Sequence, residues 1–366
     1  MKRFGVGGKL ICATIALCGL LCRYGTAEEL APARPSVEVH LYGGDTRPGA
    51  PRAQWYRTIG ITDVWIFPIK GAFRQDSRPD DQQSAHKLKA EGTLGAYRTN
   101  RIRYWWFERP VPDFLYVKSK RADFPKTHLW DDTPETDVVW NAVTDKITEI
   151  YPTVRAAGFS GLVYDNEAYY SYQGDVTGND RPWLWGGHQD QYGKEGNYYK
   201  RGRQVGEAIS AVWPRAKVIM IYCYGYEAER WWYQGIKDGG VEFFLGVEHT
   251  YGAGPLRELG SRWYHGWWQN RPTVATCEWK RTQFPFISDN QHVIAGLFPI
   301  DFGSRQPCHR ARYFREQVED AASAGIPIWL WPQGDFTAER WQEIEYVPGD
   351  SIQDYLQVLR DFSQAF

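Results

Sequence analysis

The sequence has no surplus of either charge. Its 366 residues contain 43 Lys and Arg against 44 Asp and Glu, which gives a formal net charge of −1. Because nucleic-acid binding usually requires a basic surface, this balance gives no sign of a nucleic-acid partner. A glycine-rich phosphate loop after a strand is also missing, as is the nucleophile-elbow pattern Gly-x-Ser-x-Gly. Without these motifs, catalysis by carboxylate side chains is the best-supported chemistry for this sequence.

Cysteine is scarce and unevenly placed. Three of the six cysteines lie within the first 22 residues, and the others are Cys223, Cys277 and Cys308. An odd number excludes a complete disulfide framework, although one bridge remains compatible. No Cys/His pair has the spacing of a zinc site. We therefore expect no metal and no cofactor.

Long apolar runs are absent except at the N-terminus. Residues 10–21 form an apolar run that follows Met1-Lys2-Arg3 and precedes small residues ending at Ala27. This order predicts a signal peptide over residues 1–27 and a secreted or periplasmic protein. The run is short for a membrane span, and an uncleaved anchor is the alternative. The expected mature chain, residues 28–366, suits a single barrel with insertions.

Aromatic residues are abundant: the chain has 18 Trp and 23 Tyr. Several occur in clusters, at 104–107, 183–185, 231–233 and 267–268. Trp and Tyr combine a flat apolar face with a polar edge, as sugar rings do. Each could instead be a large core residue. The excess as a whole favours a cleft that binds carbohydrate.

Short apolar segments alternate with helical patterns along the chain. We expect strands at 37–42, 62–68, 102–107, 160–165, 217–223, 241–247, 292–299 and 326–331. We expect the clearest helices at 136–157, 197–213, 255–268 and 308–324, the last ending at Gly325. About eight strand–helix repeats predict an α/β fold, a single (β/α)8 barrel. Residues 273–279 form a ninth candidate strand, and long loops are expected at 71–100, 108–135 and 171–196.

Residues 158–170 carry the strongest functional signal. A helical pattern ends at Gly158, a short apolar run follows, and Asp165, Asn166 and Glu167 come directly after it. In a parallel barrel, catalytic groups lie at this end of a strand. Side chains two apart on a strand share a face, so Asp165 and Glu167 can point into one cleft.

Hydrolysis of a glycosidic bond requires a proton donor and a second carboxylate. Two acids in one cleft push their pKa values apart, so one can stay protonated at neutral pH. Acids after other predicted strands, Glu248 and Glu278, are candidate partners. Two alternatives remain: a Cys–His pair formed by Cys223 and His249, and a metal site formed by His249, Glu248 and Asp165.

Three glycoside hydrolase patterns resemble this segment. Gly158–Glu167 is similar to strand four of family 18 chitinases, although Ser160 and Val163 replace two of that family's aspartates. Asn166-Glu167 resembles the strand-four end of clan-A retaining enzymes, which implies Glu167 as acid/base and Glu278 as the strand-seven nucleophile. Tyr164-Asp165-Asn166 resembles the α-galactosidase-like enzymes, which implies Asp165 as nucleophile. All three imply a (β/α)8 barrel that hydrolyses glycosidic bonds.

The sequence thus predicts a glycoside hydrolase acting on a poly- or oligosaccharide. Glu167 is the expected proton donor, and Asp165 tunes it or acts as nucleophile. Asn166 is expected to contact substrate, while Tyr169, Trp329 and Trp331 are expected to be partly exposed sugar platforms. Trp329-Leu330-Trp331 also resembles the Trp-bearing strand eight of family 18. The alternatives are a carbohydrate-binding barrel without catalysis and a metal-dependent barrel hydrolase or lyase.

Overall fold

The computed structural model describes most of the chain beyond residue 35. The described ranges are 36–67, 79–108, 132–165, 195–221, 223, 227–252, 272–301, 305–332, 336–346 and 348–363. All of them lie in one compact unit, Pro35–Phe366. The predicted signal peptide lies outside these ranges and stays a prediction. None of the helices in these ranges is long and apolar enough to cross a membrane.

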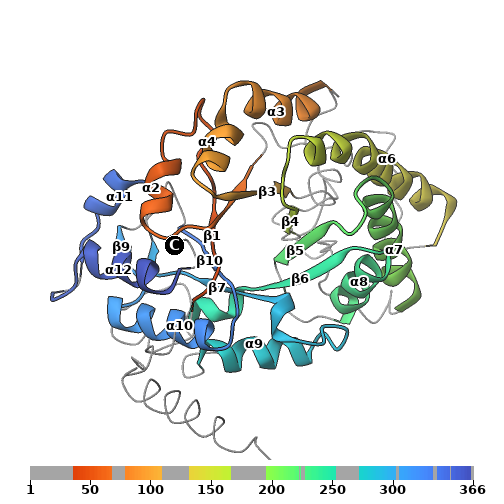
Figure 1. Ribbon diagram of the computed structural model, residues 1–366. Coiled ribbons are helices and arrows are strands. Elements are labelled where there is room, and N and C mark those ends of the chain that lie inside the picture. The colour runs from red at the N-terminus through yellow and green to blue at the C-terminus, as the bar shows by residue number, and fades with distance from the viewer. Residues whose placement is uncertain are drawn as a thin grey trace, which may run out of the picture. The chain divides into compact units, whose positions relative to one another are not determined.

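Eight parallel strands close into a barrel (Figure 1). They are β1 (Val39–Tyr42), β2 (Asp63–Ile66), β3 (Arg103–Glu108), β4 (Leu162–Asp165), β5 (Lys217–Ile221), β6 (Glu242–Val247), β7 (Val293–Leu297) and β10 (Ile328–Leu330). β1 pairs with both β2 and β10, which completes the ring. The (β/α)8 prediction is confirmed, and every strand lies within one residue of its predicted segment.

Helices surround the barrel, as Figure 1 shows. They are α2 (Ala53–Thr58), α3 (Pro79–Ala90), α4 (Thr93–Thr99), α6 (Pro134–Ala156), α7 (Glu195–Val212), α8 (Glu227–Asp238), α9 (Thr273–Thr282), α10 (Ala311–Ser323), α11 (Ala338–Gln342) and α12 (Ile352–Phe362). Short 3-10 helices η1 (Glu248–Gly252) and η3 (Asn290–His292) and a two-stranded ribbon of β8 (Ile300–Asp301) and β9 (Gln306–Pro307) complete the set. The predicted helices at 136–157, 197–213 and 308–324 are confirmed, and the helix predicted at 255–268 lies outside the described residues.

Two predictions about local structure were wrong. Residues 273–279 belong to helix α9 and not to a strand. Its buried residues, Thr273, Thr276, Cys277 and Lys280, recur with helical spacing, and this pattern outweighs the β-branched residues that suggested a strand. The segment 71–100, expected to be a loop, contains α3 and α4. Helix α3 is polar and α4 has only 7 residues, so neither shows the long apolar periodicity that predicts a helix.

Side chains alternate between the two faces of each strand and form two separate apolar clusters. The outward residues pack against the helices. The inward residues fill the barrel and are rich in aromatic rings; the buried ones are Trp65, Trp105, Phe107, Val163, Ile219, Ile221, Ile294, Phe298 and Trp329, joined by Tyr251 and Cys308. Gly296 on β7 provides room for these rings, because a Cβ there would lie 2.7 Å from Tyr251 Cε1.

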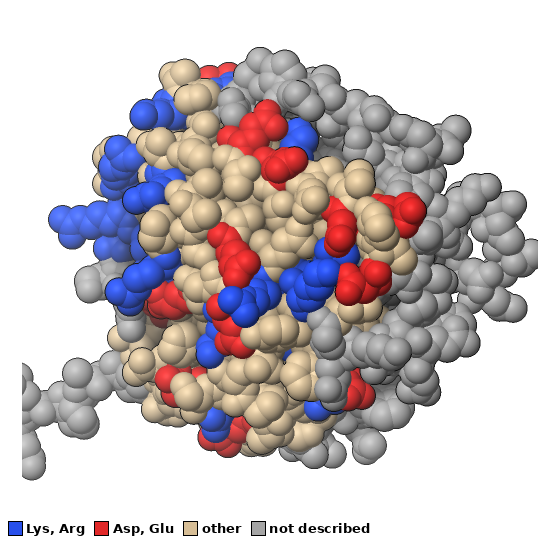
Figure 2. Space-filling view, turned by 90° about the vertical axis from the view of Figure 1, so that its right-hand side faces the viewer, with Lys and Arg blue, Asp and Glu red and all other residues tan. Residues whose placement is uncertain are grey.

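The outer surface over α6, α7 and α8 is mixed in charge. Figure 2 shows basic and acidic side chains interspersed on this side of the molecule. Arg203 on α7 pairs with Glu207 at 2.7 Å, and the buried Arg201 pairs with Asp137 of α6 at 2.6 Å. This pairing agrees with the near-zero net charge.

Candidate active site

Strand β4 ends in a buried acid on the inner side of the barrel. Gly158 has φ of +91°, a conformation that favours glycine, and it turns the chain from α6 into the strand. Val163 packs inside the barrel, so Asp165, two residues further on, shares its inward face. Asp165 is the last residue of β4 and is 5% exposed. The predicted order of helix, glycine turn, central parallel strand and terminal acid is confirmed.

Three other predicted residues of this segment lie outside the described residues; they are Asn166, Glu167 and Tyr169. Their assignment to the site therefore remains a prediction, based on their sequence positions after Asp165. The long loops predicted at 108–135 and 171–196 fall almost entirely outside the described residues as well.

Glu108, at the end of β3, faces the helices and not the barrel interior. It is 3% exposed, and its carboxylate accepts hydrogen bonds from Trp106 Nε1 and from the Tyr151 hydroxyl, the latter at 3.2 Å. Trp106 lies in the outer apolar cluster, which fixes the direction of Glu108 two residues later. From the sequence alone, this acid at a strand end does not differ from acids that face the barrel interior.

Glu248 follows β6 directly and is half-buried at the start of η1. It lies near a buried lysine, Lys280 of α9. Burial lowers the pKa of Lys280 to about 8, although the charges of Glu229, Cys223 and Glu248 oppose this shift. Glu248 thus stays a candidate partner of Asp165 and Glu167. The cation near it is Lys280 of α9.

The Cys–His alternative is disfavoured by the environment of both groups. Burial raises the pKa of the Cys223 thiol well above its ordinary value, so the nucleophilic thiolate is suppressed. Burial and the nearby Lys280 charge lower the pKa of His249 to about 3. Cys223, Cys277 and Cys308 are all buried thiols, and the one bridge that their number allowed does not form among them.

Glu278 does not follow a strand. It lies on α9 with its side chain exposed, on the ring of helices outside the barrel. The prediction that it ends strand seven was wrong, because strand seven is β7. The next inward position after β7 is Phe298. Its ring packs against that of Trp331, with ring centroids 4.9 Å apart.

The aromatic residues divide into buried and half-buried groups. Trp329 is 1% exposed and packs inside the barrel against Trp65, with ring centroids 4.9 Å apart. The prediction that Trp329 is partly exposed was wrong. Trp331, Tyr42 and Phe67, at the ends of β10, β1 and β2, are half-buried. The half-buried state of Trp331 matches the partial exposure predicted for it. Its ring stacks on that of Tyr251, with ring centroids 5.3 Å apart.

Other tryptophans pack beneath helices, although the aromatic excess as a whole favoured a carbohydrate cleft. Trp106, Trp140, Trp232 and Trp341 are all buried in the outer cluster. Trp140 and Trp232 meet between α6 and α8, with centroids 5.3 Å apart. Much of the aromatic excess therefore fills the core.

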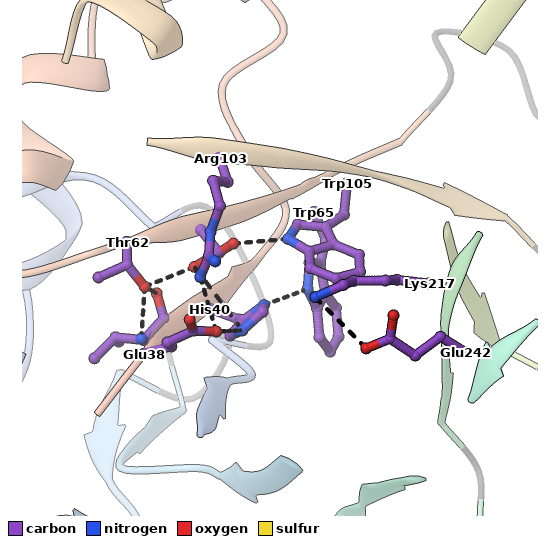
Figure 3. Close-up of polar contacts among 10 residues, drawn as sticks. Glu38, His40, Thr62, Trp65, Arg103, Trp105, Lys217 and Glu242 are labelled. Atoms are coloured by element: carbon purple, nitrogen blue, oxygen red, sulfur yellow. Dashed lines mark hydrogen bonds and ion pairs between the residues drawn. The ribbon is translucent and has the colours of Figure 1, made fainter. Parts of the chain in front are cut away.

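A polar cluster closes the opposite end of the barrel interior (Figure 3). Arg103 Nη2 lies 2.8 Å from Glu38 Oε2 and 2.7 Å from Asp63 Oδ2. Asp63 also accepts hydrogen bonds from Trp105 Nε1 at 2.7 Å and from the Thr62 hydroxyl at 2.7 Å. The nearby His40, whose Nε2 lies 3.7 Å from Glu38 Oε2, and Arg103 lower the pKa of Glu38 to about 2, against the effect of burial.

The residues Glu38, His40 and Asp63 offer three ligand atoms within 4.8 Å of one another, but they do not fit a metal ion. Trp65 Nε1 donates to His40 Nδ1 at 3.2 Å, so the proton of the neutral imidazole belongs on Nε2. A metal-binding histidine instead donates from its second nitrogen to an acceptor. Arg103 also occupies the carboxylate oxygens, so the cluster is an ion-pair network.

No protein-family model matches the chain, and no curated protein matches it. Among solved structures, the chain resembles a glycoside hydrolase family 5 enzyme from Prevotella bryantii B14, with TM-score 0.51 and 11% identity over 89% of this chain and 96% of that enzyme. A Bacteroidetes-affiliated family 5 cellulase gives TM-score 0.50 and 11% identity over 90% and 91% of the two chains.

The chain has the barrel fold of glycoside hydrolases. An exo-beta-1,4-mannosidase from Opitutaceae bacterium strain TAV5 gives a TM-score of 0.46 at 13% identity, over 90% of this chain. The chain spans only 60% of that enzyme's length. At 11% identity, the two family 5 structures show a shared fold.

Proposed function

We propose that the protein is a glycoside hydrolase that cleaves O-glycosidic bonds of a poly- or oligosaccharide. The observation that supports this most directly is Asp165, which is buried and inward-facing at the C-terminal end of β4. Glu167 follows it by two residues. In (β/α)8 enzymes this end of the barrel carries the catalytic groups.

Each acid has an assigned role in this proposal. Glu167 protonates the leaving oxygen, and Asp165 either raises the pKa of Glu167 or attacks the sugar as nucleophile. The inward position after β7 is Phe298, so a strand-seven carboxylate at this position is not available as partner. Asp165 is therefore the preferred partner, and Glu248 at the end of β6 is the second choice.

The half-buried rings at the same end support a carbohydrate substrate. Trp331, Tyr42 and Phe67 come from three adjacent strands, β10, β1 and β2. Their apolar faces suit the C–H faces of sugar rings. The proposed substrate class is therefore a poly- or oligosaccharide.

The first experiment tests hydrolysis itself. The full chain is incubated with carboxymethyl cellulose, mannan, xylan and chitin oligosaccharides, and the release of reducing ends is measured. We expect release from at least one glycan and none from the matched Asp165→Asn/Glu167→Gln double variant. Equal release by both proteins would remove these acids from the mechanism.

The second experiment tests the role of Glu167. Glu167→Gln should lower turnover of natural glycans about a hundredfold or more, as expected for a lost general acid. Turnover of aryl glycosides whose leaving group requires no proton should fall much less. A uniform loss across both substrate types would contradict the assignment of Glu167 as proton donor.

A carbohydrate-binding barrel without catalysis is the second candidate function. The observation that favours it is Phe298, which stands where clan-A retaining enzymes carry a nucleophile. Binding of a glycan without any product, measured by tryptophan fluorescence and chromatography, would support this candidate over hydrolysis.

We also propose export through the signal peptide at residues 1–27. Its basic start, its apolar run and the small residues that end at Ala27 support this. N-terminal sequencing of the secreted protein should begin at Glu28, and a mature protein that starts at Met1 would contradict cleavage.

A further inference from the structure

A chain of hydrogen bonds lies directly behind Asp165. Tyr164 faces outward from β4 and is 1% exposed, and its hydroxyl bonds to the hydroxyl of Tyr151 on α6. Tyr151 donates to Glu108 Oε2 at 3.2 Å. Glu108 also accepts a hydrogen bond from Trp106 Nε1. The chain thus joins the end of β4, helix α6 and the end of β3.

The direction of this chain follows from its proton count. Trp106 Nε1 can only donate, and Tyr151 has a single hydroxyl proton. With Glu108 ionised, Tyr151 donates to the carboxylate, and Tyr164 must then donate to Tyr151. Burial raises the pKa of both tyrosines well above the ordinary value, which keeps both protons in place.

The contacts determine how the end of β4 is held. Glu108 and Tyr164 are register partners across β3 and β4. Asp165 is the next residue, and its side chain leaves the opposite face of the strand. A rotation of the Tyr164 peptide that broke the hydroxyl contact would also turn Asp165 away from its inward position.

We propose that Glu108 is a positioning residue for Asp165 and acts through Tyr151 and Tyr164. The proposal rests on the proposed function, in which Asp165 belongs to the reacting acids. Glu108 itself touches no substrate, since it lies on the helix side of the sheet. Its role is to fix the orientation of the strand end that carries Asp165.

The test breaks the chain at its middle and at its end. Tyr151→Phe and Tyr164→Phe should each lower kcat roughly tenfold with KM unchanged, because small displacements of a reacting group reduce turnover more than binding. The substrate is the glycan that the wild-type chain hydrolyses fastest in the polysaccharide panel.

The matched control is Tyr355→Phe. Tyr355 is also fully buried, and its hydroxyl donates to the backbone oxygen of His309. It lies on α12, across the barrel from α6 (Figure 1). This variant should show a similar loss of melting temperature with kcat unchanged. A kcat in the Tyr151 and Tyr164 variants no lower than in this control would overturn the proposal.

A measurement without substrate separates this proposal from the proposed function. In protein labelled with [¹³C]aspartate, the Asp165 carboxyl signal is assigned with Asp165→Asn. Glu108→Gln, Tyr151→Phe and Tyr164→Phe should each shift that signal, and Tyr355→Phe should not. An unmoved signal in all three variants would overturn the positioning role. A shifted signal in a protein that hydrolyses no glycan would sustain it and reject the hydrolase.

Discussion

The two ends of the barrel interior each carry a buried acid, Asp63 on β2 and Asp165 on β4, in different surroundings. At the N-terminal end, Asp63 is bound by Arg103, Thr62 and Trp105. At the C-terminal end, Asp165 lies among strand ends with half-buried aromatic rings such as Trp331. The first arrangement saturates a carboxylate with donors, as a stabilising network does. The second places an acid at the same end of the barrel as apolar ring faces, which suits the proposed function.

The position of an acid within a strand determines the end of the barrel at which it lies. An acid that precedes the apolar core of a strand, as Asp63 does on β2, belongs to the closed end. An acid that terminates a strand, as Asp165 does on β4, belongs to the end where barrel enzymes carry catalytic groups. Changes at the closed end should therefore affect stability, and changes at the other end should affect glycan binding and turnover.

The largest expected effect is on stability, from Trp329→Ala. Trp329 is fully buried between Trp65 and Tyr251, so its removal leaves a large cavity. The free energy of unfolding should fall by about 3–5 kcal/mol. Urea denaturation measures this value. A loss no greater than that of Trp331→Ala would contradict the division into buried and half-buried rings.

Asp63→Asn should lower stability, whereas Asp165→Asn should lower turnover. Asp63→Asn removes the buried one of the two carboxylates that pair with Arg103, so the free energy of unfolding should fall by about 2–3 kcal/mol. Turnover by the folded protein should not change. Asp165→Asn should lower turnover about a hundredfold. Kinetics and denaturation of both variants check the pair, and similar outcomes would erase the contrast between the two ends.

Trp331→Ala should weaken oligosaccharide binding roughly tenfold. A sugar face on an indole contributes on the order of 1–2 kcal/mol, given typical gains per buried apolar area. Fluorescence titration with soluble oligosaccharides measures the change in affinity. Phe286→Leu, a half-buried ring in the outer cluster, is the control and should bind normally. Unchanged affinity in Trp331→Ala would remove this ring from the proposed site.

The smallest expected effect concerns Glu38 and pH. Its pKa of about 2 in the folded protein lies below the ordinary 4.5, so ionised Glu38 stabilises the fold. This contribution is complete above pH 4.5 and is lost as the pH falls towards 2. Since Glu38 is partly exposed to solvent, we expect only about 1 kcal/mol. Acid denaturation of Glu38→Gln should lack this component, and identical curves for both proteins would contradict it.

Much of the fold followed from the sequence. The spacing of apolar segments predicted all eight strands, because a barrel strand is buried on both faces and forms a continuous apolar run. The motif at 158–165 predicted a glycine turn, a strand and a terminal acid in the order observed. Helix α9 was not predicted, because its few buried positions are mixed with β-branched residues that are typical of strands.

The candidate site was predictable only in part. The alternation of side chains gave the inward face of Asp165 but could not show that Glu108 faces a helix, since this depends on which residues of β3 point inward. The abundance of tryptophan indicated sugar binding, yet Trp106, Trp140 and Trp232 pack against helices. Composition records how many rings exist and carries no information about which surface each ring covers.

Local periodicity in the sequence is enough to predict the order of elements, the barrel class and the position of Asp165 at a strand end. Which distant groups meet depends on how the chain folds in three dimensions. Arg103 neutralises Glu38 and Asp63 across neighbouring strands, Phe298 takes the inward place after β7, and Tyr151 reaches Glu108 from α6. These contacts join residues far apart in the chain, and closure of the barrel brings them together.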